Sequence, residues 1–248
     1  MHSIGIIPAR YASTRFPGKP LARLGDKTLI QHVYERARQT RLDAIIVATD
    51  DARIYQAVEA FGGTVRYSRA DHSSGTDRCA EVAATLAADV IVNIQGDEPF
   101  FSTSAIDRLL AAFSAPTTHI ATLVCPLTDN ALIHDPNVVK VVADQHERAL
   151  YFSRSPIPYV RDLPAQEWNT TQSYLQHIGI YAFRAAVLQE ITRLPVSPLE
   201  RLEALEQLRW LQAGYTIQIV ATDEKSIGVD TPADLEVARQ MLLSQGMR

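Results

Sequence analysis

Three cationic side chains occupy one loop after the first apolar run of this sequence. Arg10, Arg15 and Lys19 follow residues 4–7, and no acidic residue occurs between residues 8 and 20. Arg binds phosphate through paired hydrogen bonds and Lys binds it as a point charge, so the loop predicts a polyphosphate ligand. A basic surface loop without a ligand is the alternative. The loop has neither the Gly-x-x-x-x-Gly-Lys-Ser/Thr nor the Gly-x-Gly-x-x-Gly spacing, which excludes those two kinds of nucleotide site.

Two carboxylates follow a second apolar run. Residues 90–94 lead into Gln95 and Gly96, and then into Asp97 and Glu98. Mg²⁺ is bound by one or two carboxylates together with phosphate oxygens, so Asp97 close to a polyphosphate predicts a magnesium site. The glycine would let another group approach the backbone closely. An ordinary Asp-Glu-Pro turn is the alternative, because Asp initiates turns readily.

Asp230 is the second candidate metal ligand. It precedes Thr231 as a helix N-cap, Pro232 at the first helical position and Asp234 in the first turn. Asp230 therefore has an alternative role as part of this helix start. Spacing along the chain does not show whether it reaches Asp97.

A further helix start lies at residues 74–78, where small residues precede Arg78. The free N–H groups of a helix start bind anions, although an ordinary capped helix has the same pattern. The seven histidines have no metal-ligand spacing, and His177 is expected to be a hydrogen-bonded core residue of a strand. Nothing in the sequence indicates a Ser-His-Asp triad or a zinc site.

The elements that position these residues alternate between strands and helices. Strands are expected at 4–7, 44–49, 64–67 and 90–95, and helices at 28–39, 51–61 and 76–88. This order predicts a doubly wound, mostly parallel α/β sheet. In such sheets, ligands bind at the carboxyl ends of the strands, where the cationic loop and Asp97 are expected.

The pattern changes after residue 115. Strands at 120–125, 138–143 and 149–153 have no helices between them, which predicts a smaller antiparallel addition. A proline-rich loop spans 153–171. Further elements are a strand at 177–183, a helix at 198–213, a strand at 216–220 and a helix at 232–244. Leucines at every third position of the 198–213 helix drift around its surface, so we expect several covered faces and a homodimer.

Composition excludes several classes of protein. The 248 residues include 24 basic and 28 acidic side chains, and a net charge of −4 argues against a nucleic-acid partner. No apolar run approaches the ~20 residues that span a bilayer, so no membrane insertion is expected. The first residues lack the features of a signal peptide. Cys79 and Cys125 are far apart, which favours reduced thiols in a cytoplasmic protein.

Seven motifs, in order along the whole chain, resemble those of the CMP-Kdo synthetases, also called 3-deoxy-manno-octulosonate cytidylyltransferases. The first motif is shared in looser form with CMP-sialic acid synthetases, and the later ones are more specific. The motifs are IPARYASTRFPGKP at 7–20, HSSGTDR at 72–78, NIQGDEP at 93–99, SRSPIP at 153–158, HIGIY at 177–181, LEQLR at 205–209 and GVDTP at 228–232.

The resemblance implies a Rossmann-like fold of the nucleotidyltransferase type and the reaction CTP + Kdo → CMP-Kdo + pyrophosphate, with Mg²⁺ as the cofactor. The product would serve lipopolysaccharide biosynthesis. One nucleotidyltransferase domain would span 1–248. Residues 1–115 would mainly bind nucleotide, and residues 116–248 would mainly bind the sugar and form the dimer.

The resemblance also implies roles for individual residues. Lys19, Arg15, Asp97 and Asp230 would act in catalysis, and the two aspartates would bind the metal. The nucleotide would contact Pro8, Ala9, Arg10, Arg15, Lys19, Gly75, Thr76, Arg78, Gln95 and Asp97. The sugar would contact Gln95, Arg154, His177, Tyr181, Glu206 and Gln207, with Arg154 meeting its carboxylate.

Three alternatives to this function remain. The same chemistry would act on another acidic sugar, such as a sialic acid or 8-amino-Kdo. A nucleotide-sugar binding protein without activity is a second alternative, but such relatives usually lose groups like Lys19, Asp97 and Asp230 first. A pyrophosphorylase for another nucleotide would be expected to have a Gly-rich first loop, which is absent here.

Overall fold

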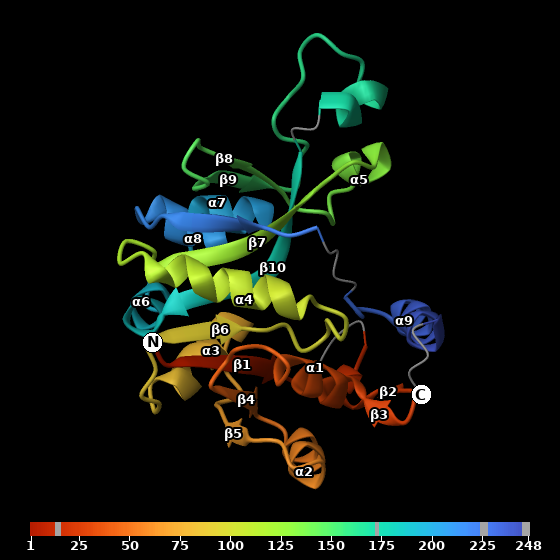
Figure 1. The fold of residues 1–248 in the computed structure, drawn as a ribbon, viewed down its shortest axis with the longest axis vertical. Coiled ribbons are helices and arrows are strands. Elements are labelled where there is room, and N and C mark those ends of the chain that lie inside the picture. Colours follow the sequence, from red (N-terminus) through yellow and green to blue (C-terminus); the bar gives the residue numbers. More distant parts are fainter. Residues whose placement is uncertain (13–15, 172–173, 224–227, 245–248) are drawn as a thin grey trace. The chain divides into compact units, whose positions relative to one another are not determined.

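The computed structural model describes residues 1–12, 16–171, 174–223 and 228–244 (Figure 1). The chain forms two compact units. The first unit comprises Met1–Asp107 and Ser226–Arg248, and the second comprises Arg108–Lys225. The assignment of the chain to one domain with a nucleotide half and a sugar half stays a prediction.

A parallel sheet forms the centre of the first unit. Its strands are β1 (Ser3–Ala9), β4 (Ala44–Thr49), β5 (Val65–Tyr67) and β6 (Val90–Asn93), in the order β6-β1-β4-β5. Ile6 of β1 pairs with Ile46 on one side and with Asn93 on the other. The side chains of β1 are buried on both faces, as expected for a central parallel strand.

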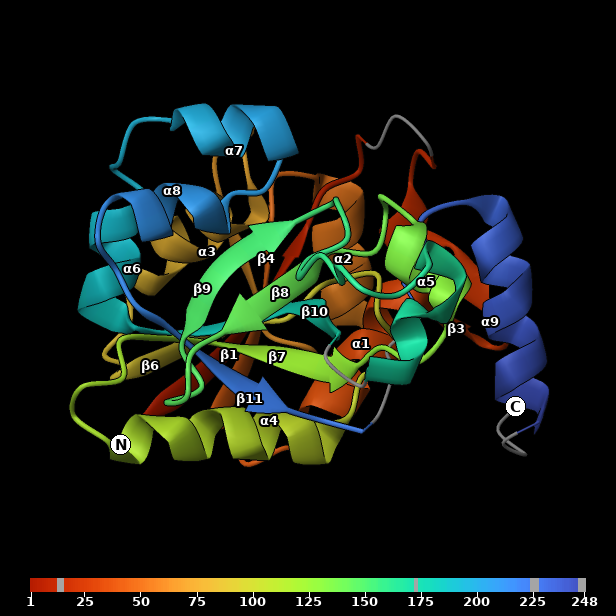
Figure 2. The ribbon, with the colours of Figure 1, turned by 90° about the horizontal axis from the view of Figure 1, so that it is seen from above.

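Helices cover both faces of this sheet. They are α1 (Leu29–Ala37), α2 (Ala52–Ala60) and α3 (Gly75–Ala83). Right-handed connections place α1 and α2 on one face and α3 on the other, as Figure 2 shows. The prediction for α3 extended to residue 88. The helix ends earlier because the N–H groups of Thr85 and Leu86 bond three residues back, to Val82 and Ala83.

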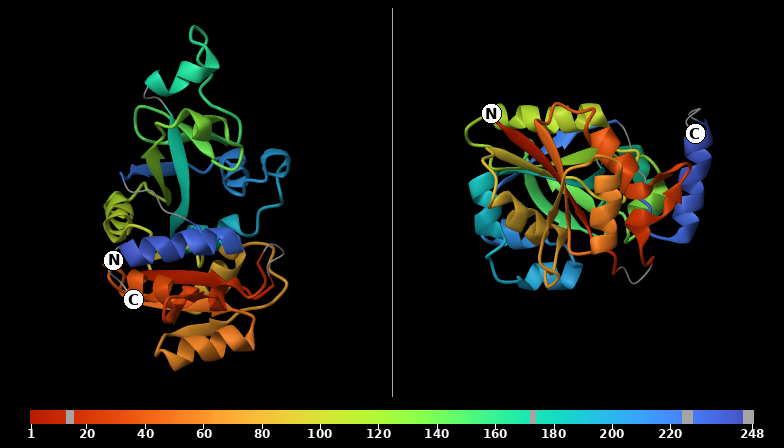
Figure 3. Two further views of the ribbon diagram at one scale, coloured as in Figure 1. Left: turned by 90° about the vertical axis from the view of Figure 1, so that its right-hand side faces the viewer. Right: turned by 90° about the horizontal axis from the view of Figure 1, so that it is seen from below.

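The end of the chain returns to the first unit as α9 (Pro232–Ser244). Its apolar side packs on residues near the short elements η1 (Lys19–Leu21), β2 (Arg23–Leu24) and β3 (Lys27–Thr28) (Figure 3). The buried residues of this cluster are Leu24, Leu29, Val229, Leu235, Ala238 and Leu242. The predicted helix at 232–244 is confirmed, and it anchors the segment that carries Asp230.

The second unit begins within α4 (Thr103–Ala111), continues through η2 (Ala112–Ser114) and contains the antiparallel strands. The strands are β7 (Ile120–Pro126), β8 (Lys140–Ala143), β9 (Ala149–Ser153), β10 (Leu175–Arg184) and β11 (Ile217–Ala221). β10 pairs antiparallel with β7 and β8, β8 with β9, and β11 lies parallel to β7. The predicted antiparallel addition is confirmed, although the short α5 (Asn130–His134) separates β7 from β8.

The loop at 153–171 contributes to a small apolar cluster with Leu127, Ile133 and Tyr174. It ends in η3 (Ala165–Thr171), where the buried Trp168 stacks with Tyr174 at a ring distance of 6.3 Å. The Tyr174 hydroxyl donates to the Pro158 carbonyl oxygen at 2.6 Å. The end of the loop is therefore packed around Trp168, whereas Tyr159 earlier in the loop is 75% exposed.

The single helix expected at 198–213 is wrong. After α6 (Ala185–Ile191), the structure has α7 (Pro198–Glu203) and α8 (Gln207–Gln212), separated at Ala204. Ala204 has a φ of 51°, in the left-handed region that ends a helix. The break also changes which leucines are covered, because Leu205 and Leu208 are buried while Leu202 is 83% exposed.

Both units together contain α-helices with parallel and antiparallel strands, which confirms the predicted α/β class. The side chains of Cys79 and Cys125 are both buried. None of the helices within the described residues is both long and apolar enough to cross a membrane.

Candidate active site

A cavity of about 320 Å³ lies in the first unit, at the carboxyl ends of β1 and β6. This is the location at which an open parallel sheet binds ligands. The volume falls at the lower end of the usual range for small-molecule sites, about 300–1,000 Å³. Its lining residues are Pro8, Ala9, Arg10, Lys19, Pro20, His72, Ser73, Ser74, Gly75, Arg78, Gln95, Gly96, Asp97 and Asp230.

An ion-paired triad stands in this cavity. The Lys19 ammonium lies 2.5 Å from Asp97 Oδ2 and 3.0 Å from Asp230 Oδ1. The structure thus brings together three residues that are distant in the sequence, with Lys19 and Asp230 separated by 211 positions. The sequence interpretation left Lys19 without a partner within its own loop, and the fold supplies two.

A tight turn positions Lys19. Gly18 has a φ of 73° and N-caps η1, and its N–H donates to the Tyr11 carbonyl oxygen at 2.9 Å. A Cβ atom on Gly18 would approach the Tyr11 ring to 3.0 Å. Glycine is therefore required for both the backbone angle and the space, and the turn directs Lys19 towards the carboxylates.

A backbone hydrogen bond brings Asp230 to Asp97. The N–H of Val229 donates to the carbonyl oxygen of Asp97 at 2.8 Å, and the Val229 side chain is fully buried. Behind Asp230, the Asp234 carboxylate accepts from the N–H groups of Asp230 and Thr231 at 3.0 and 2.8 Å. One segment thus both starts α9 and carries the candidate metal ligand Asp230.

The backbone at Pro8 comes so close to residue 96 that glycine is favoured at this position. A Cβ atom at this position would lie 3.0 Å from the Pro8 carbonyl oxygen, which is tighter than ordinary contact. Gly75 likewise faces Pro8, because a Cβ atom there would lie 3.2 Å from the proline ring. Because neither glycine has a side chain, three segments can meet around one cavity: the end of β1, the segment that carries Asp97 and the start of α3.

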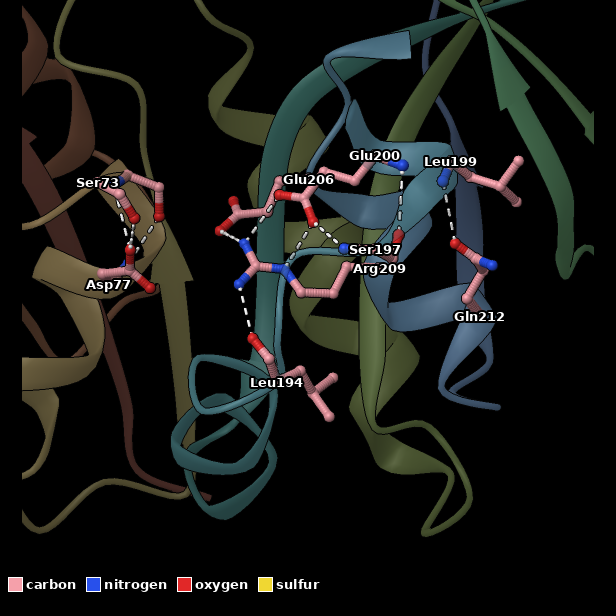
Figure 4. Close-up of polar contacts among 10 residues, drawn as sticks. Ser73, Asp77, Leu194, Ser197, Leu199, Glu200, Glu206, Arg209 and Gln212 are labelled. Atoms are coloured by element: carbon pink, nitrogen blue, oxygen red, sulfur yellow. Dashed lines mark hydrogen bonds and ion pairs between the residues drawn. The ribbon is translucent and has the colours of Figure 1, made fainter. Parts of the chain in front are cut away.

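The start of α3 is a complete capping box. The Asp77 N–H donates to Ser74 Oγ at 3.1 Å, and the Ser74 N–H donates back to Asp77 Oδ2 at 3.1 Å. The Asp77 carboxylate also accepts a hydrogen bond from the Ser73 hydroxyl at 2.7 Å (Figure 4). The cap holds Ser73, Ser74 and Gly75 at the cavity wall, where the helix start favours an anion.

Two predicted nucleotide contacts on α3 are already engaged. Arg78 is 4% exposed, forms an ion pair with Asp50 at 3.4 Å and donates to the Ser68 hydroxyl. Thr76 is buried, and its hydroxyl lies 3.5 Å from Asn93 Nδ2. Arg78 still lines the cavity, whereas Thr76 lies behind the lining residues.

Sequence reasoning missed His72. Its side chain is 8% exposed, lines the cavity and lies 2.6 Å from Glu81 Oε2. Burial by itself would raise the pKa of Glu81, but hydrogen bonds from His72 and from the Arg69 N–H lower it below its usual value. The available signal was the position of His72 at the head of the 72–78 motif, in which only Gly75, Thr76 and Arg78 were assigned.

A cation–π contact holds Tyr11, which lies near the start of the cationic loop. The Arg53 guanidinium lies 3.3 Å from the centre of the Tyr11 ring. Asp51 accepts from Arg53 Nε at 2.9 Å and from Nη2 at 2.6 Å, which orients the guanidinium. Because the Tyr11 carbonyl also receives the Gly18 N–H, Arg53 supports the turn that presents Lys19.

We expect Arg53→Met to raise the KM for the nucleotide about two- to fivefold, the value of a partly exposed cation–π contact, with kcat changed less than about twofold. Arg53→Lys should restore part of the loss because it keeps the charge over the ring. The measurement is steady-state kinetics with varied nucleotide. Arg41→Met, which removes an exposed arginine from the same unit, is the matched control. An unchanged KM in Arg53→Met would remove this contact from nucleotide binding.

The two aspartates fit a divalent cation that is shared with a bound phosphate. Within the part of the chain that the structure describes, no three His, Cys, Asp or Glu side chains converge to enclose a metal. Mg²⁺ needs only one or two carboxylates when phosphates and water complete its shell. Asp97 and Asp230 supply two carboxylates that already hold one cation, the Lys19 ammonium.

The other residues that were predicted to bind nucleotide differ in where the structure places them. Pro8, Ala9, Arg10, Gln95 and Gly75 all line the cavity. Arg10 is exposed and forms no ion pair with any described residue. Arg15 lies outside the described residues.

The predicted sugar contacts, other than Gln95, lie in the second unit. His177 is partly buried, with its ring centre 5.2 Å from that of Tyr181 and its Nε2 atom 3.0 Å from the Thr122 hydroxyl. Burial lowers the pKa of His177 to about 3, so the ring is neutral at physiological pH. The predicted hydrogen bond of His177 is present, whereas its side chain is only partly buried.

Two buried polar groups in the second unit, one of them on Tyr181 beside His177, have unused hydrogen-bonding capacity. The Tyr181 hydroxyl lies near Thr122 without the geometry of a hydrogen bond, and Gln207 Nε2 has no partner among the described residues. Both residues are more than 90% buried. Buried polar groups are normally paired, so these two indicate a place for a polar ligand.

Arg209 orients Glu206, as Figure 4 shows. Its guanidinium binds Glu200 through Nε and Nη2 at 3.0 Å each, Glu206 through Nη2 at 3.3 Å, and the Leu194 carbonyl oxygen through Nη1 at 3.1 Å. Glu200 is in turn held by the capping box with Ser197. The network links the start of α7 to the start of α8 across the break at Ala204.

Arg154 has a structural role that the sequence did not reveal. Its guanidinium donates to the carbonyl oxygens of Glu203 at 2.6 Å, Pro136 at 2.9 Å and Ala204 at 3.3 Å. The contacts with Glu203 and Ala204 satisfy carbonyl groups where α7 ends, at the break before α8. Three of its five N–H groups are engaged, which leaves two for a carboxylate.

The lowered pKa of His177 gives a prediction for stability. The unfolded state binds a proton near pH 6.5 and the folded state near pH 3, so the free energy of unfolding falls as pH decreases between these values. We expect a loss of up to about 2 kcal/mol between pH 7 and pH 5 from this residue. His177→Phe should lose less stability over the same interval, measured by urea denaturation.

The exposed His119 provides the control, because His119→Gln should retain the pH dependence of the unaltered protein. Equal pH slopes in His177→Phe and the unaltered protein would contradict the assignment of a neutral His177 ring with a lowered pKa.

Comparison with known proteins agrees with the geometry. The family model described as cytidylyltransferase matches residues 4–227. The 3-deoxy-manno-octulosonate cytidylyltransferase of Bacteroides thetaiotaomicron is 53% identical over 247 residues and covers 98% of each chain. The protein of the same name from Parabacteroides distasonis is 50% identical and covers 99% of this chain and 100% of its own.

A solved structure extends the likeness to three dimensions. The structure of a CMP-2-keto-3-deoxy-manno-octonic acid synthetase complexed with CTP has a TM-score of 0.93 and 44% identity. It covers 99% of this chain and 100% of its own.

Proposed function

The chain belongs to the 3-deoxy-manno-octulosonate cytidylyltransferase family, and we propose that it transfers the cytidylyl group of CTP to Kdo, with release of pyrophosphate. The observation that carries the proposal is the Lys19 ammonium held between Asp97 and Asp230 at a cavity of about 320 Å³. Cations and paired carboxylates at the end of a parallel sheet suit a nucleoside triphosphate with a divalent metal.

In the proposed reaction, the anomeric hydroxyl oxygen of Kdo forms a bond to the α-phosphorus of CTP. The bond from that phosphorus to the bridging oxygen of pyrophosphate breaks, the electron pair leaves with pyrophosphate, and the hydroxyl proton passes to water. Negative charge grows on the phosphoryl and leaving oxygens. Fixed positive charges stabilise this arrangement more than they stabilise bound substrate, which is the condition for raising kcat.

Lys19 is the central cation of this chain in the proposed mechanism, because its side chain is only 13% exposed and its backbone is fixed by the Gly18 turn. Arg10 and Arg15 would add charge at the triphosphate. The nucleotide would be positioned by the wall segments that carry Pro8, Ala9, Gly75, Thr76, Arg78 and Gln95.

Asp97 and Asp230 would hold Mg²⁺ through their carboxylate oxygens. Bound Mg²⁺ would neutralise phosphate charge and lower the pKa of a coordinated hydroxyl. The chain contributes the orientation of the two carboxylates, through the Val229 hydrogen bond and the α9 start.

The second unit would bind the sugar. Neutral His177, the Tyr181 hydroxyl and Gln207 Nε2 provide polar groups that suit sugar hydroxyls, and Glu206 is held by Arg209. The two remaining N–H groups of Arg154 suit a carboxylate. These features favour an acidic sugar over a neutral one.

Pyrophosphate release from CTP and Mg²⁺ tests the proposal. Kdo, 8-amino-Kdo and N-acetylneuraminic acid are compared with a reaction that lacks sugar. We expect release with Kdo. Release with only another acidic sugar would retain the cytidylyl transfer and reject the Kdo assignment. Tight CTP binding without release with any sugar would favour a nucleotide-binding protein.

We further propose a homodimer in the cytoplasm whose product serves lipopolysaccharide biosynthesis. The exposed Leu202 on α7, together with Val196 at 47% exposure, supports an apolar contact surface in the second unit. Analytical ultracentrifugation of the unaltered protein and of Leu202→Glu tests the dimer. A monomer in the unaltered protein at micromolar concentration would reject it.

A further inference from the structure

Lys19 occupies the position of a cation between the two candidate metal ligands. Its ammonium contacts one oxygen of Asp97 at 2.5 Å and one of Asp230 at 3.0 Å. On the basis of the proposed function, we infer that Lys19 is an internal counter-ion that keeps free divalent cations out of this site until a nucleotide arrives.

Charge explains why the ammonium lies there. Two carboxylates fixed close together repel each other, and Asp97 is held in place through its own backbone by Val229. The Lys19 side chain is 13% exposed, compared with 28% for Asp97 and 44% for Asp230, so Lys19 is the most enclosed of the three charged residues. Its single charge offsets part of the repulsion without a metal.

A free divalent cation therefore has to displace Lys19 before it binds both carboxylates. The displaced ammonium would lie near another cation, because Arg10 also lines the cavity and forms no ion pair with any described residue. That arrangement is unfavourable in the absence of an anion.

A bound triphosphate would make it easier to displace Lys19 and would also help to bind the metal. Its oxygens provide new partners for the Lys19 ammonium and additional ligands for the metal. The nucleotide would thus transfer Lys19 from the carboxylates to phosphate and open the site to the cation in the same event. Lys19 would have two successive partners, carboxylate before nucleotide binding and phosphate afterwards.

Metal binding without nucleotide tests this inference independently of activity. Mn²⁺ is the probe, and free Mn²⁺ is measured by electron paramagnetic resonance during titration of the purified protein. We expect Lys19→Met and Lys19→Gln to bind Mn²⁺ at least about tenfold more tightly than the unaltered protein, because a nearby positive charge is removed. Adding Asp97→Asn to Lys19→Met should abolish the gain.

Lys27→Met is the matched control. Lys27 belongs to the same unit and pairs with Glu35 at 2.8 Å, outside the cavity. Its removal should leave Mn²⁺ affinity unchanged. Melting temperatures of all variants establish that the comparison is made on folded protein.

Equal Mn²⁺ affinity in Lys19→Met, Lys19→Gln and the unaltered protein would overturn the inference, as would a gain that survives Asp97→Asn. The outcome is separable from the proposed function. Tighter Mn²⁺ binding in the Lys19 variants, with no pyrophosphate release from CTP and Kdo by the unaltered protein, would retain the counter-ion and reject the reaction. Activity of the unaltered protein with unchanged Mn²⁺ affinity in the variants would retain the reaction and reject the counter-ion.

Discussion

Replacement of Asp97 by Asn is expected to lower kcat by about a thousandfold at saturating CTP, Kdo and Mg²⁺. Asn keeps the shape of the side chain and its ability to accept a hydrogen bond from Lys19. It removes the formal charge on which a hard divalent cation depends. The backbone carbonyl of Asp97, which receives the Val229 N–H, is unaffected, so the geometry around Asp230 should persist.

Pyrophosphate release at saturating substrate provides the measurement. Asp107→Asn is the control, because Asp107 pairs with Arg41 and its side chain is 28% exposed, the same fraction as Asp97. A kcat for Asp97→Asn within about twofold of the unaltered protein would exclude this carboxylate as a metal ligand.

Replacement of Lys19 by Met is expected to lower kcat by about a hundred- to a thousandfold, with the KM for Kdo changed less than about threefold. Met retains the apolar stem but removes the ammonium. An interaction that strengthens as charge develops on the phosphates lowers the barrier to reaction, whereas sugar binding depends on other residues. Initial rates over a matrix of CTP and Kdo concentrations separate the two constants.

Lys27→Met is again the control, since it removes a paired lysine of the same unit. A rise in the KM for Kdo with an unchanged kcat would instead place Lys19 in sugar binding. An unchanged kcat and KM would remove it from the reaction.

Arg154 illustrates how one residue can combine structure and recognition. The resemblance implies that it binds the sugar carboxylate, and in the structure it donates to three backbone carbonyl oxygens, those of Glu203 and Ala204 at the end of α7 and that of Pro136. The contacts hold the chain just before Glu206 and Gln207. Arg154 would thus shape the proposed sugar site as well as bind within it.

Several local elements of this protein follow from the sequence alone. The apolar runs at 44–49 and 90–94 predict buried parallel strands, and both are present as β4 and β6. Thr231, Pro232 and Asp234 predict the start of α9, because capping depends on residues only a few positions apart. The motifs also indicate which segments carry the chemistry.

The sequence did not predict the break at Ala204. Alanine favours a helix, and its left-handed conformation is stabilised by Arg154, which is 50 residues away. Likewise, the residues of the α7–α8 network that orient Glu206 come together only because the helix is interrupted.

The convergence of the candidate site was decided by tertiary structure. Asp97 and Asp230 meet because a buried valine and one backbone hydrogen bond join the ends of two distant segments. Local sequence determines where a strand ends and a helix begins, since those events depend on neighbouring residues. Whether Lys19 lies in solvent or between two carboxylates depends on packing between segments 211 positions apart, and that packing exists only in the folded chain.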